Sequence, residues 1–141
     1  MAKADPGLEL LGKVPLFSGL TRKELTLVHS LAKPFHFAAG SAVVSEGDTA
    51  SRFFLVTDGY ARVLVGGRVR RVCGPGDYFG ELALIDEGPR TATVVAETEL
   101  QTLGIAAFNF RPLLRSEPTI TYKLLVEMAR WLRDSDAALV R

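Results

Sequence analysis

The stretch from Phe79 to Val94, FGELALIDEGPRTATV, brings together a glycine, a carboxylate and an arginine in a spacing that suits anion binding. A glycine such as Gly80 lets the backbone approach a ligand closely, and a short helical turn after it leaves N–H groups that attract an anion. Arg90 can bind a phosphate through a forked, charge-assisted pair of hydrogen bonds. Glu81 has the opposite charge, so it requires a hydrogen-bond donor such as a sugar hydroxyl. These residue types together describe a site for a sugar phosphate.

The same stretch resembles the phosphate-binding segment of the cyclic nucleotide-binding domain family, of the type found in the catabolite activator and in kinase regulatory subunits. The family pattern is F-G-E, an apolar residue, A-L, a short loop, then P-R, a small residue or Thr or Ser, A, any residue and V. The fixed positions are matched here by Phe79, Gly80, Glu81, Ala83, Leu84, Pro89, Arg90, Ala92 and Val94. The resemblance extends over most of the chain, from about Leu16 to Leu132, and includes 45–48, 53–56 and 74–77.

The resemblance implies a role for each residue of the stretch. Arg90 would bind the cyclic phosphate, and Glu81 would accept a hydrogen bond from the ribose 2′-hydroxyl. The implied ligand-binding set is Gly80, Glu81, Leu82, Ala83, Arg90, Thr91 and Ala92. Without the resemblance, Arg90 could form a surface ion pair with Asp86 or Glu87. Glu81 could likewise be a carboxylate favoured by the dipole at a helix start.

Two residues bear on the base of the nucleotide. In the family, a Thr or Ser at the position of Thr91 can bind the phosphate or the exocyclic amine of guanine, so the choice between cAMP and cGMP stays open, with cAMP favoured slightly by its wider use in bacteria. One residue of the family's C-terminal helix closes over the base, and Trp131 offers a π face for this lid. The alternative is a core tryptophan on an apolar stripe. Val63, Val65 and Val72 are candidates for the apolar wall of the site or for the core.

The elements that must position these residues are short strands. Strand-like runs separated by glycine-containing turns lie at 35–38, 42–44, 53–57, 61–65, 69–72, 91–96 and 100–105. Gly66 and Gly67, between two of these runs, predict a two-residue hairpin. Many short strands at this spacing predict an α+β, mainly β fold, with a jelly-roll barrel or sandwich over about residues 33–105.

Helices are predicted on both sides of the barrel. Thr21 and Glu24 form a capping box for a helix over 22–32, preceded by a short turn at 8–11 and an extended segment at 14–17. C-terminal helices are predicted at 106–114, interrupted at Pro112, and at about 117–139, with Ser116 as its cap. The chain, 1–141, is therefore expected to be a single domain in which an N-terminal helix and C-terminal helices, about 106–139, pack on the barrel.

Composition and cysteine content exclude several classes of site. The chain has 141 residues, 48% hydrophobic and 23% charged, with a formal net charge of +1, which is typical of a globular domain. Cys73 is the one cysteine, and His29 and His36 lack ligand partners at metal spacing, so no metal site, catalytic residue or enzyme activity is expected. A metal enzyme on a jelly-roll scaffold is disfavoured for the same reason. No signal peptide or membrane span is recognisable, so the expected location is cytoplasmic.

The expected function is that of a regulatory or sensor domain that binds cAMP or cGMP and shifts its C-terminal helices when the ligand binds. The alternative is an interaction domain that keeps the fold without a ligand. Few residues follow the long helix, so binding of nucleic acid by the chain itself is not expected. The effector protein or fused domain, the completeness of the chain and the pairing of two copies through the long helix stay open.

Overall fold

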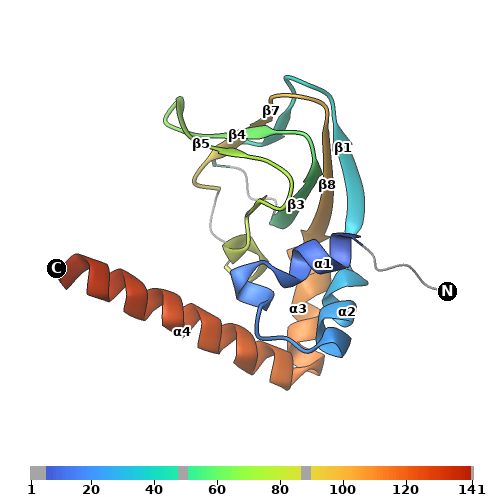
Figure 1. The fold of residues 1–141 in the computed structure, drawn as a ribbon, viewed down its shortest axis with the longest axis vertical. Helices are drawn as coiled ribbons and strands as arrows, with labels where there is room; N and C mark the ends of the chain where they lie inside the picture. Colours follow the sequence, from blue (N-terminus) through green and yellow to red (C-terminus); the bar gives the residue numbers. More distant parts are fainter. Residues whose placement is uncertain (1–5, 48–50, 87–89, 141) are drawn as a thin grey trace.

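The strands form two four-stranded antiparallel sheets that pack face to face as a jelly roll (Figure 1), in a computed structural model that describes residues 6–47, 51–86 and 90–140. The first sheet has the order β1 (Lys33–Phe37), β8 (Leu100–Ala106), β3 (Arg52–Asp58) and β6 (Tyr78–Phe79). The second has the order β2 (Ala42–Val44), β7 (Thr93–Ala96), β4 (Ala61–Val65) and β5 (Arg68–Cys73). The predicted mainly β fold with flanking helices is confirmed.

The space between the sheets is filled by side chains that alternate along each strand. On β3, Phe54 and Val56 point to this interior, while Phe53 and Leu55 lie in a separate cluster on the other face of the strand. All four are buried, because β3 is covered on both faces. The remaining buried residues of the interior are Ala61, Val63, Cys73, Phe79, Val94, Ala96 and Leu100.

The hairpin between β4 and β5 turns at Gly66 and Gly67, as the sequence predicts. Their φ angles are 59° and 78°, and a two-residue turn of this kind requires positive φ at both central positions. The register is interrupted by a bulge, because Val63 pairs with Arg71 whereas Leu64 pairs with Val69. Arg70 is the extra residue between these two pairs.

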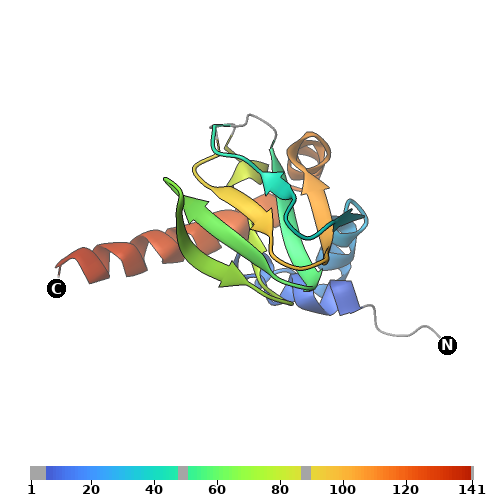
Figure 2. The same cartoon turned by 90° about the horizontal axis from the view of Figure 1, so that it is seen from above.

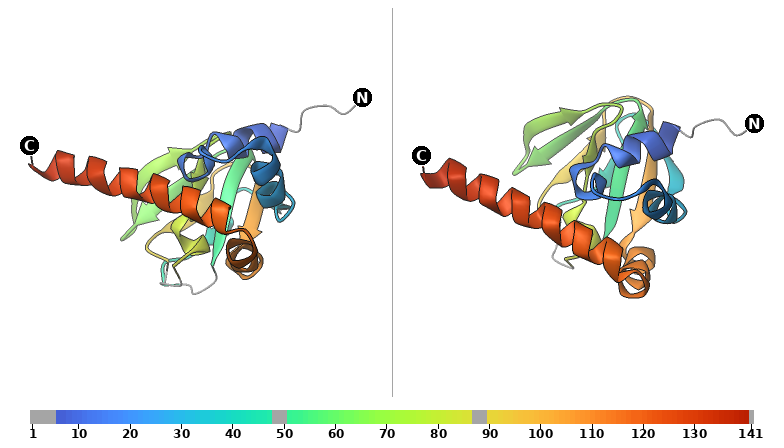
Figure 3. Two further views of the ribbon diagram at one scale, coloured as in Figure 1. Left: turned by 90° about the horizontal axis from the view of Figure 1, so that it is seen from below. Right: turned by 60° about the horizontal axis from the view of Figure 1, so that its bottom comes forward.

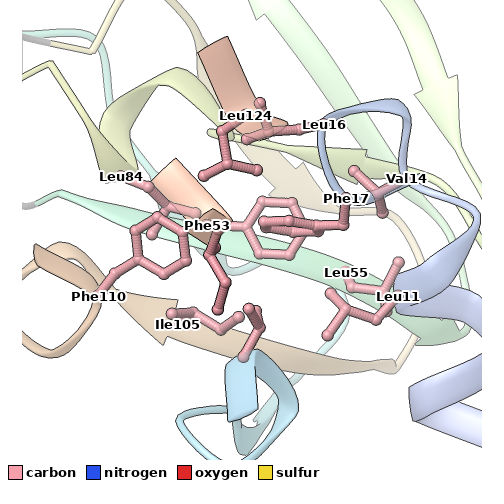
Figure 4. Packing of buried hydrophobic residues seen from close by; sticks show 12 residues of the cluster. Leu11, Val14, Leu16, Phe17, Phe53, Leu55, Leu84, Ile105, Phe110 and Leu124 are labelled. Carbon is pink, nitrogen blue, oxygen red and sulfur yellow. The ribbon is translucent and has the colours of Figure 1, made fainter. Parts of the chain in front are cut away.

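The helices pack on the outer face of the first sheet (Figure 3). They are α1 (Pro6–Gly12), the 3₁₀ turn η1 (Pro15–Phe17), α2 (Arg22–His29), α3 (Ala107–Ser116) and α4 (Pro118–Val140). Figure 4 shows the cluster that joins them to the sheet, in which Phe17 packs against Phe53 at a centroid distance of 5.8 Å and against Phe110 at 6.1 Å. Ile120 and Leu124 bring α4 into the same cluster.

Several predicted boundaries were wrong for local reasons. The capping box of Thr21 and Glu24 is present, but α2 ends at His29 instead of residue 32. Residues 15–17 form η1 rather than an extended segment, because the proline at its first position has a φ compatible with helix. Pro112 lies inside a continuous α3, and Ser116 ends that helix, where its hydroxyl donates to the carbonyl of Leu113 rather than capping α4.

The short strand β6 was not predicted, since two residues carry no recognisable period, whereas η2 (Leu82–Leu84) is the short helical turn expected after Gly80. Viewed from above (Figure 2), α4 extends well past the edge of the sheets, on the side where the β4–β5 hairpin also protrudes. Among the helices of the described residues, none has the length and apolarity needed to span a membrane.

Candidate functional site

A pocket of about 240 Å³ opens between β4, β7 and the turn η2. Its floor is continuous with the interior between the sheets, because Val63, Phe79 and Val94 belong to both. The lining residues are Val44, Val63, Phe79, Gly80, Glu81, Leu82, Ala83, Asp86, Arg90, Thr91, Ala92 and Val94. All seven residues of the predicted ligand-binding set therefore line one pocket.

The guanidinium group of Arg90 lies against Gly80. A Cβ atom at position 80 would be 2.5 Å from Nη1 of Arg90 and 2.6 Å from the carbonyl oxygen of Arg52. Gly80 also has φ +83°, a conformation that side chains other than glycine rarely adopt. The Nη2 atom of Arg90 donates to that same carbonyl of Arg52. Glycine is required here for two reasons, backbone conformation and the space that the arginine occupies.

The backbone at Arg90 is also held in place. Its carbonyl accepts a hydrogen bond of 2.9 Å from the N–H of Gly47, in the segment that follows β2. Beside it, the N–H of Glu46 donates to Thr93 at 3.0 Å, and the Glu46 carboxylate accepts from the N–H of Gly66 at 2.9 Å. These bonds join the arginine segment to two other parts of the barrel. Pro89, Glu87 and Asp48 of the predicted motifs lie outside the described residues.

Glu81 begins the turn η2 on the other side of the pocket. The first backbone hydrogen bond of this turn runs from Ala83 to Gly80 at 3.0 Å, so the N–H of Leu82 precedes the bonded part of the turn. Burial raises the pKa of the Glu81 carboxyl above its ordinary value. A hydrogen bond from its own backbone N–H and the charges of Arg71 and Arg90 act in the opposite direction. Glu81 is thus a partly desolvated carboxylate within the field of two arginines.

The apolar part of the pocket comes from the second sheet. Val44, Val63 and Val94 lie on three neighbouring strands and form a wall beside the charged residues. Val63 lines the pocket and also belongs to the interior cluster, whereas Val65 and Val72 fit neither expectation, because they do not line this pocket and are 39% and 53% exposed. Val65 is on the same face as Val63 but lies at the exposed end of β4, whereas Val72 pairs with Arg62 and points to the opposite face of the sheet.

Trp131 is not among the residues that line the pocket. It is partly buried and packs against the cluster between the helices and the first sheet, which also contains Leu84 and Leu124. This arrangement matches the alternative of a tryptophan on the apolar stripe of α4. A lid role for Trp131 requires a different placement of the helix and stays a prediction.

Sequence reasoning did not identify several residues that shape the site. Val44 and Asp86 line the pocket, the carbonyl of Arg52 holds Arg90, and Arg71 acts on Glu81. Backbone carbonyls leave no signal in a sequence, and the partner of Arg71 depends on the register of the hairpin.

The arrangement can bind a ligand with a phosphate and hydroxyl groups. Arg90 offers a fixed cation, Glu81 an acceptor, and the valine wall an apolar surface. In residues 6–47, 51–86 and 90–140, no group of three or more His, Cys, Asp or Glu side chains is placed to hold a metal ion. His36 contacts Glu99 at 2.5 Å, and both side chains are exposed.

Comparisons with known proteins agree with this geometry. Residues 34–117 match the family model described as the cyclic nucleotide-binding domain. The chain is 33% identical over 130 residues to the cyclic AMP receptor protein of Thermus thermophilus, covering 89% of the chain and 60% of that protein. It is 36% identical over 110 residues to the cAMP-dependent protein kinase regulatory subunit of Aspergillus niger, covering 74% of the chain and 26% of that protein. The chain thus spans less than two thirds of the length of these relatives.

Solved structures similar to this chain also contain domains of regulatory proteins. The N-terminal domain of a transcriptional regulator from Streptomyces coelicolor superposes with a TM-score of 0.85 at 31% identity, covering 92% of this chain and 94% of that one. The regulatory domain of Toxoplasma gondii PKA, crystallised with cAMP, superposes with a TM-score of 0.70 at 31% identity, covering 76% of this chain and 42% of that one. By its sequence and its fold, this chain belongs to the cyclic nucleotide-binding domain family.

Proposed function

We propose that this chain is a regulatory domain that binds cAMP or cGMP in the pocket between η2 and the second sheet. The observation that carries this function is the presence of Arg90 and Glu81 in one pocket, with Arg90 held against Gly80. The cyclic phosphate would contact the guanidinium of Arg90, and the ribose 2′-hydroxyl would donate to Glu81. Leu82, Ala83, Thr91 and Ala92 would surround the phosphate and sugar.

The base would lie along the apolar wall formed by Val44, Val63 and Val94. The volume of about 240 Å³ is below the roughly 300 Å³ at which small-molecule sites usually begin, so part of the nucleotide would remain uncovered. A helix that closes over this open side would increase the buried surface of the base. Trp131 on α4 is the aromatic residue that we assign to this closure.

The choice of base depends on Thr91, which lines the pocket and has an exposed side chain. Its hydroxyl can reach either a phosphate oxygen or the amine of guanine, according to the orientation of the base. The relatives named for cAMP support this nucleotide as the first ligand to test. A guanine is compatible with the same hydroxyl.

The route from the pocket to the helices passes through Leu84. This residue belongs to η2, yet its side chain is fully buried in the cluster that contains Phe110 of α3 and Leu124 of α4. A phosphate that moved η2 toward Arg90 would therefore disturb the packing of both helices. The ligand can shift the helices only by as much as its contacts differ between the two arrangements.

A second copy of this chain is the partner that α4 fits. Tyr122, Leu125 and Leu132 lie at helical spacing on one stripe and are 68%, 59% and 67% exposed. The buried stripe of the same helix contains Ile120 and Leu124. Pairing of two α4 helices would cover the exposed stripe. Light scattering should then report a dimer that Leu125→Glu converts to a monomer.

Calorimetry with cAMP and with cGMP tests the binding function. We expect micromolar binding, roughly −8 kcal/mol, to the unmodified protein. Arg90→Ala should weaken binding at least a hundredfold, whereas Arg68→Ala on the exposed β5 strand should leave it unchanged. Absence of binding to either nucleotide would favour the ligand-free interaction domain, and turnover of the nucleotide would indicate an enzyme.

A further inference from the structure

A second arginine, Arg71, lies next to the pocket on β5. It pairs across the hairpin with Val63, which lines the pocket. Residues directly opposite each other in an antiparallel pair project to the same face of the sheet, so Arg71 follows Val63 toward this side. Its Nη2 atom donates to the carbonyl of Tyr78 at 2.7 Å. Tyr78 is three residues before Glu81, so this bond brings the guanidinium to the segment that carries the carboxylate.

The charges around Glu81 favour such a contact. Burial raises the pKa of Glu81, its own N–H lowers it, and Arg71 lowers it further, with a larger effect than Arg90. The titratable and charged groups on the elements around this turn include Arg52, Arg71, Cys73, Asp77, Tyr78, Asp86, Arg90 and Arg111. Burial also raises the pKa of Tyr78 and of Cys73, and Arg71 opposes the rise in both. Arg71 thus acts on the whole segment from Cys73 to Glu81.

With a nucleotide bound, the positive charge of Arg71 would stabilise the site more than it does without one. Its phosphate adds a negative charge next to Arg90, which would then compensate the phosphate as well as Glu81. With a single arginine, the phosphate and the carboxylate would leave one negative charge in a partly desolvated pocket. Arg71 restores the balance without occupying the space of the ligand, because it does not line the pocket.

We propose that Arg71 is a positioning residue of the nucleotide site, which is held on the carbonyl of Tyr78 and keeps Glu81 ionised and oriented for the ribose hydroxyl. This inference rests on the proposed function. The bond to Tyr78 uses one N–H of a guanidinium that has five, so the same group can hold the backbone and face the carboxylate. Arg71 would act through Glu81 and need not contact the nucleotide.

The first measurement is nucleotide affinity against pH. Arg71→Gln should weaken cAMP and cGMP binding about threefold to tenfold at pH 7, the size of one partly screened charge pair. Because loss of Arg71 raises the pKa of Glu81 further, the affinity of the variant should begin to fall at a higher pH than that of the unmodified protein. Arg71→Lys, which keeps the charge, should restore most of the affinity.

Arg70→Gln is the matched control. Arg70 is the exposed bulge residue next to Arg71 on the same strand, and its removal changes the net charge equally. It should leave both the affinity and its pH dependence unchanged. An equal effect of Arg70→Gln, or a loss in Arg71→Gln that is constant with pH, would overturn the proposal.

The second measurement needs no ligand. A carbon-13 NMR titration of the Glu81 carboxyl should show a higher midpoint in Arg71→Gln than in the unmodified protein and in Arg70→Gln. An unchanged midpoint overturns the inference even if the protein binds nucleotide. Failure of the unmodified protein to bind any cyclic nucleotide instead overturns the proposed function, and with it the role of Arg71 in binding.

Discussion

The ammonium group of Lys123 lies 2.6 Å from Oε1 of Glu24, which ties α4 to the N-terminus of α2 across 99 residues of sequence. The same carboxylate oxygen accepts the N–H of Thr21 at 2.8 Å in the capping box. Both side chains of the ion pair are largely covered, with 29% and 16% exposed. One carboxylate therefore caps the start of α2 and also holds the first turns of α4, the helix that would have to move in a ligand response.

Lys123→Met should lower the free energy of unfolding by about 1 kcal/mol, because it removes a charged hydrogen bond from a partly buried carboxylate. Urea denaturation measures this change. Lys23→Met, which removes an exposed lysine from α2, is the control and should have little effect.

The hydrogen bond from Lys123, followed by that from the Thr21 N–H, also lowers the pKa of Glu24 below its ordinary value of 4.5. The ionised carboxylate of Glu24 therefore stabilises the folded state above pH 4.5, and this stabilisation is lost as the pH falls through the lowered pKa. In Lys123→Met, the free energy of unfolding should accordingly depend less on pH in this acidic range.

Gly80→Ala should displace Arg90 and weaken nucleotide binding at least tenfold. The new Cβ would lie 2.5 Å from Nη1 of Arg90, and φ +83° should cost a further 1–2 kcal/mol of stability, roughly, in any residue other than glycine. Gly40→Ala is the control, since Gly40 has φ +86° and no atom within 4 Å of an added Cβ. Calorimetry and thermal melting should show a stability loss in both variants and an affinity loss only at position 80.

Glu81→Gln separates ligand binding from folding stability. Nucleotide affinity should fall about tenfold or more, since a neutral amide replaces an ionised acceptor. Burial raises the pKa of Glu81 in the folded state, so the ionised carboxylate destabilises the folded protein at a pH above that raised pKa. This destabilisation disappears at a pH below the ordinary pKa of a glutamate, where the carboxyl is protonated in both the folded and the unfolded state. Glu81→Gln should accordingly raise the melting temperature of the ligand-free protein at pH 7–8 but not at pH 4. A lower melting temperature at pH 7 would contradict this account of the site.

Thr91→Ala should change the ratio of cGMP to cAMP affinity. If the hydroxyl binds the amine of guanine, its removal weakens cGMP about fivefold to tenfold and cAMP much less. Thr91→Ser keeps the hydroxyl and should retain the ratio. Equal losses for both nucleotides would instead place the hydroxyl on the phosphate.

Trp131 is the one tryptophan of the chain, so its fluorescence reports on α4 directly. Because Trp131 packs against the helix cluster, a ligand that moves it onto the base should shift and quench its emission. Trp131→Ala should weaken nucleotide binding about tenfold and also destabilise the protein by about 1–3 kcal/mol. Unchanged affinity, together with unchanged emission in the unmodified protein, would exclude the lid.

The features that the sequence alone predicted correctly are those determined by residues close together in the chain. The capping box at Thr21, the Gly66–Gly67 hairpin and the residue types around Gly80 and Arg90 all depend on neighbours a few positions apart, and each is present in the structure. The residues that the motif brings together line one pocket because the short turn η2 and the start of β7 are close in sequence as well as in space.

Only the tertiary structure decided which distant groups meet. Arg90 is held by the carbonyl of Arg52, 38 residues away, and Arg71 reaches the segment of Glu81 because of one hairpin bulge. Trp131 packs on the cluster around Leu84 rather than in the pocket. Such contacts follow from strand register and helix packing, in which a shift of one residue turns a side chain to the opposite face, and no local pattern in the sequence specifies that register.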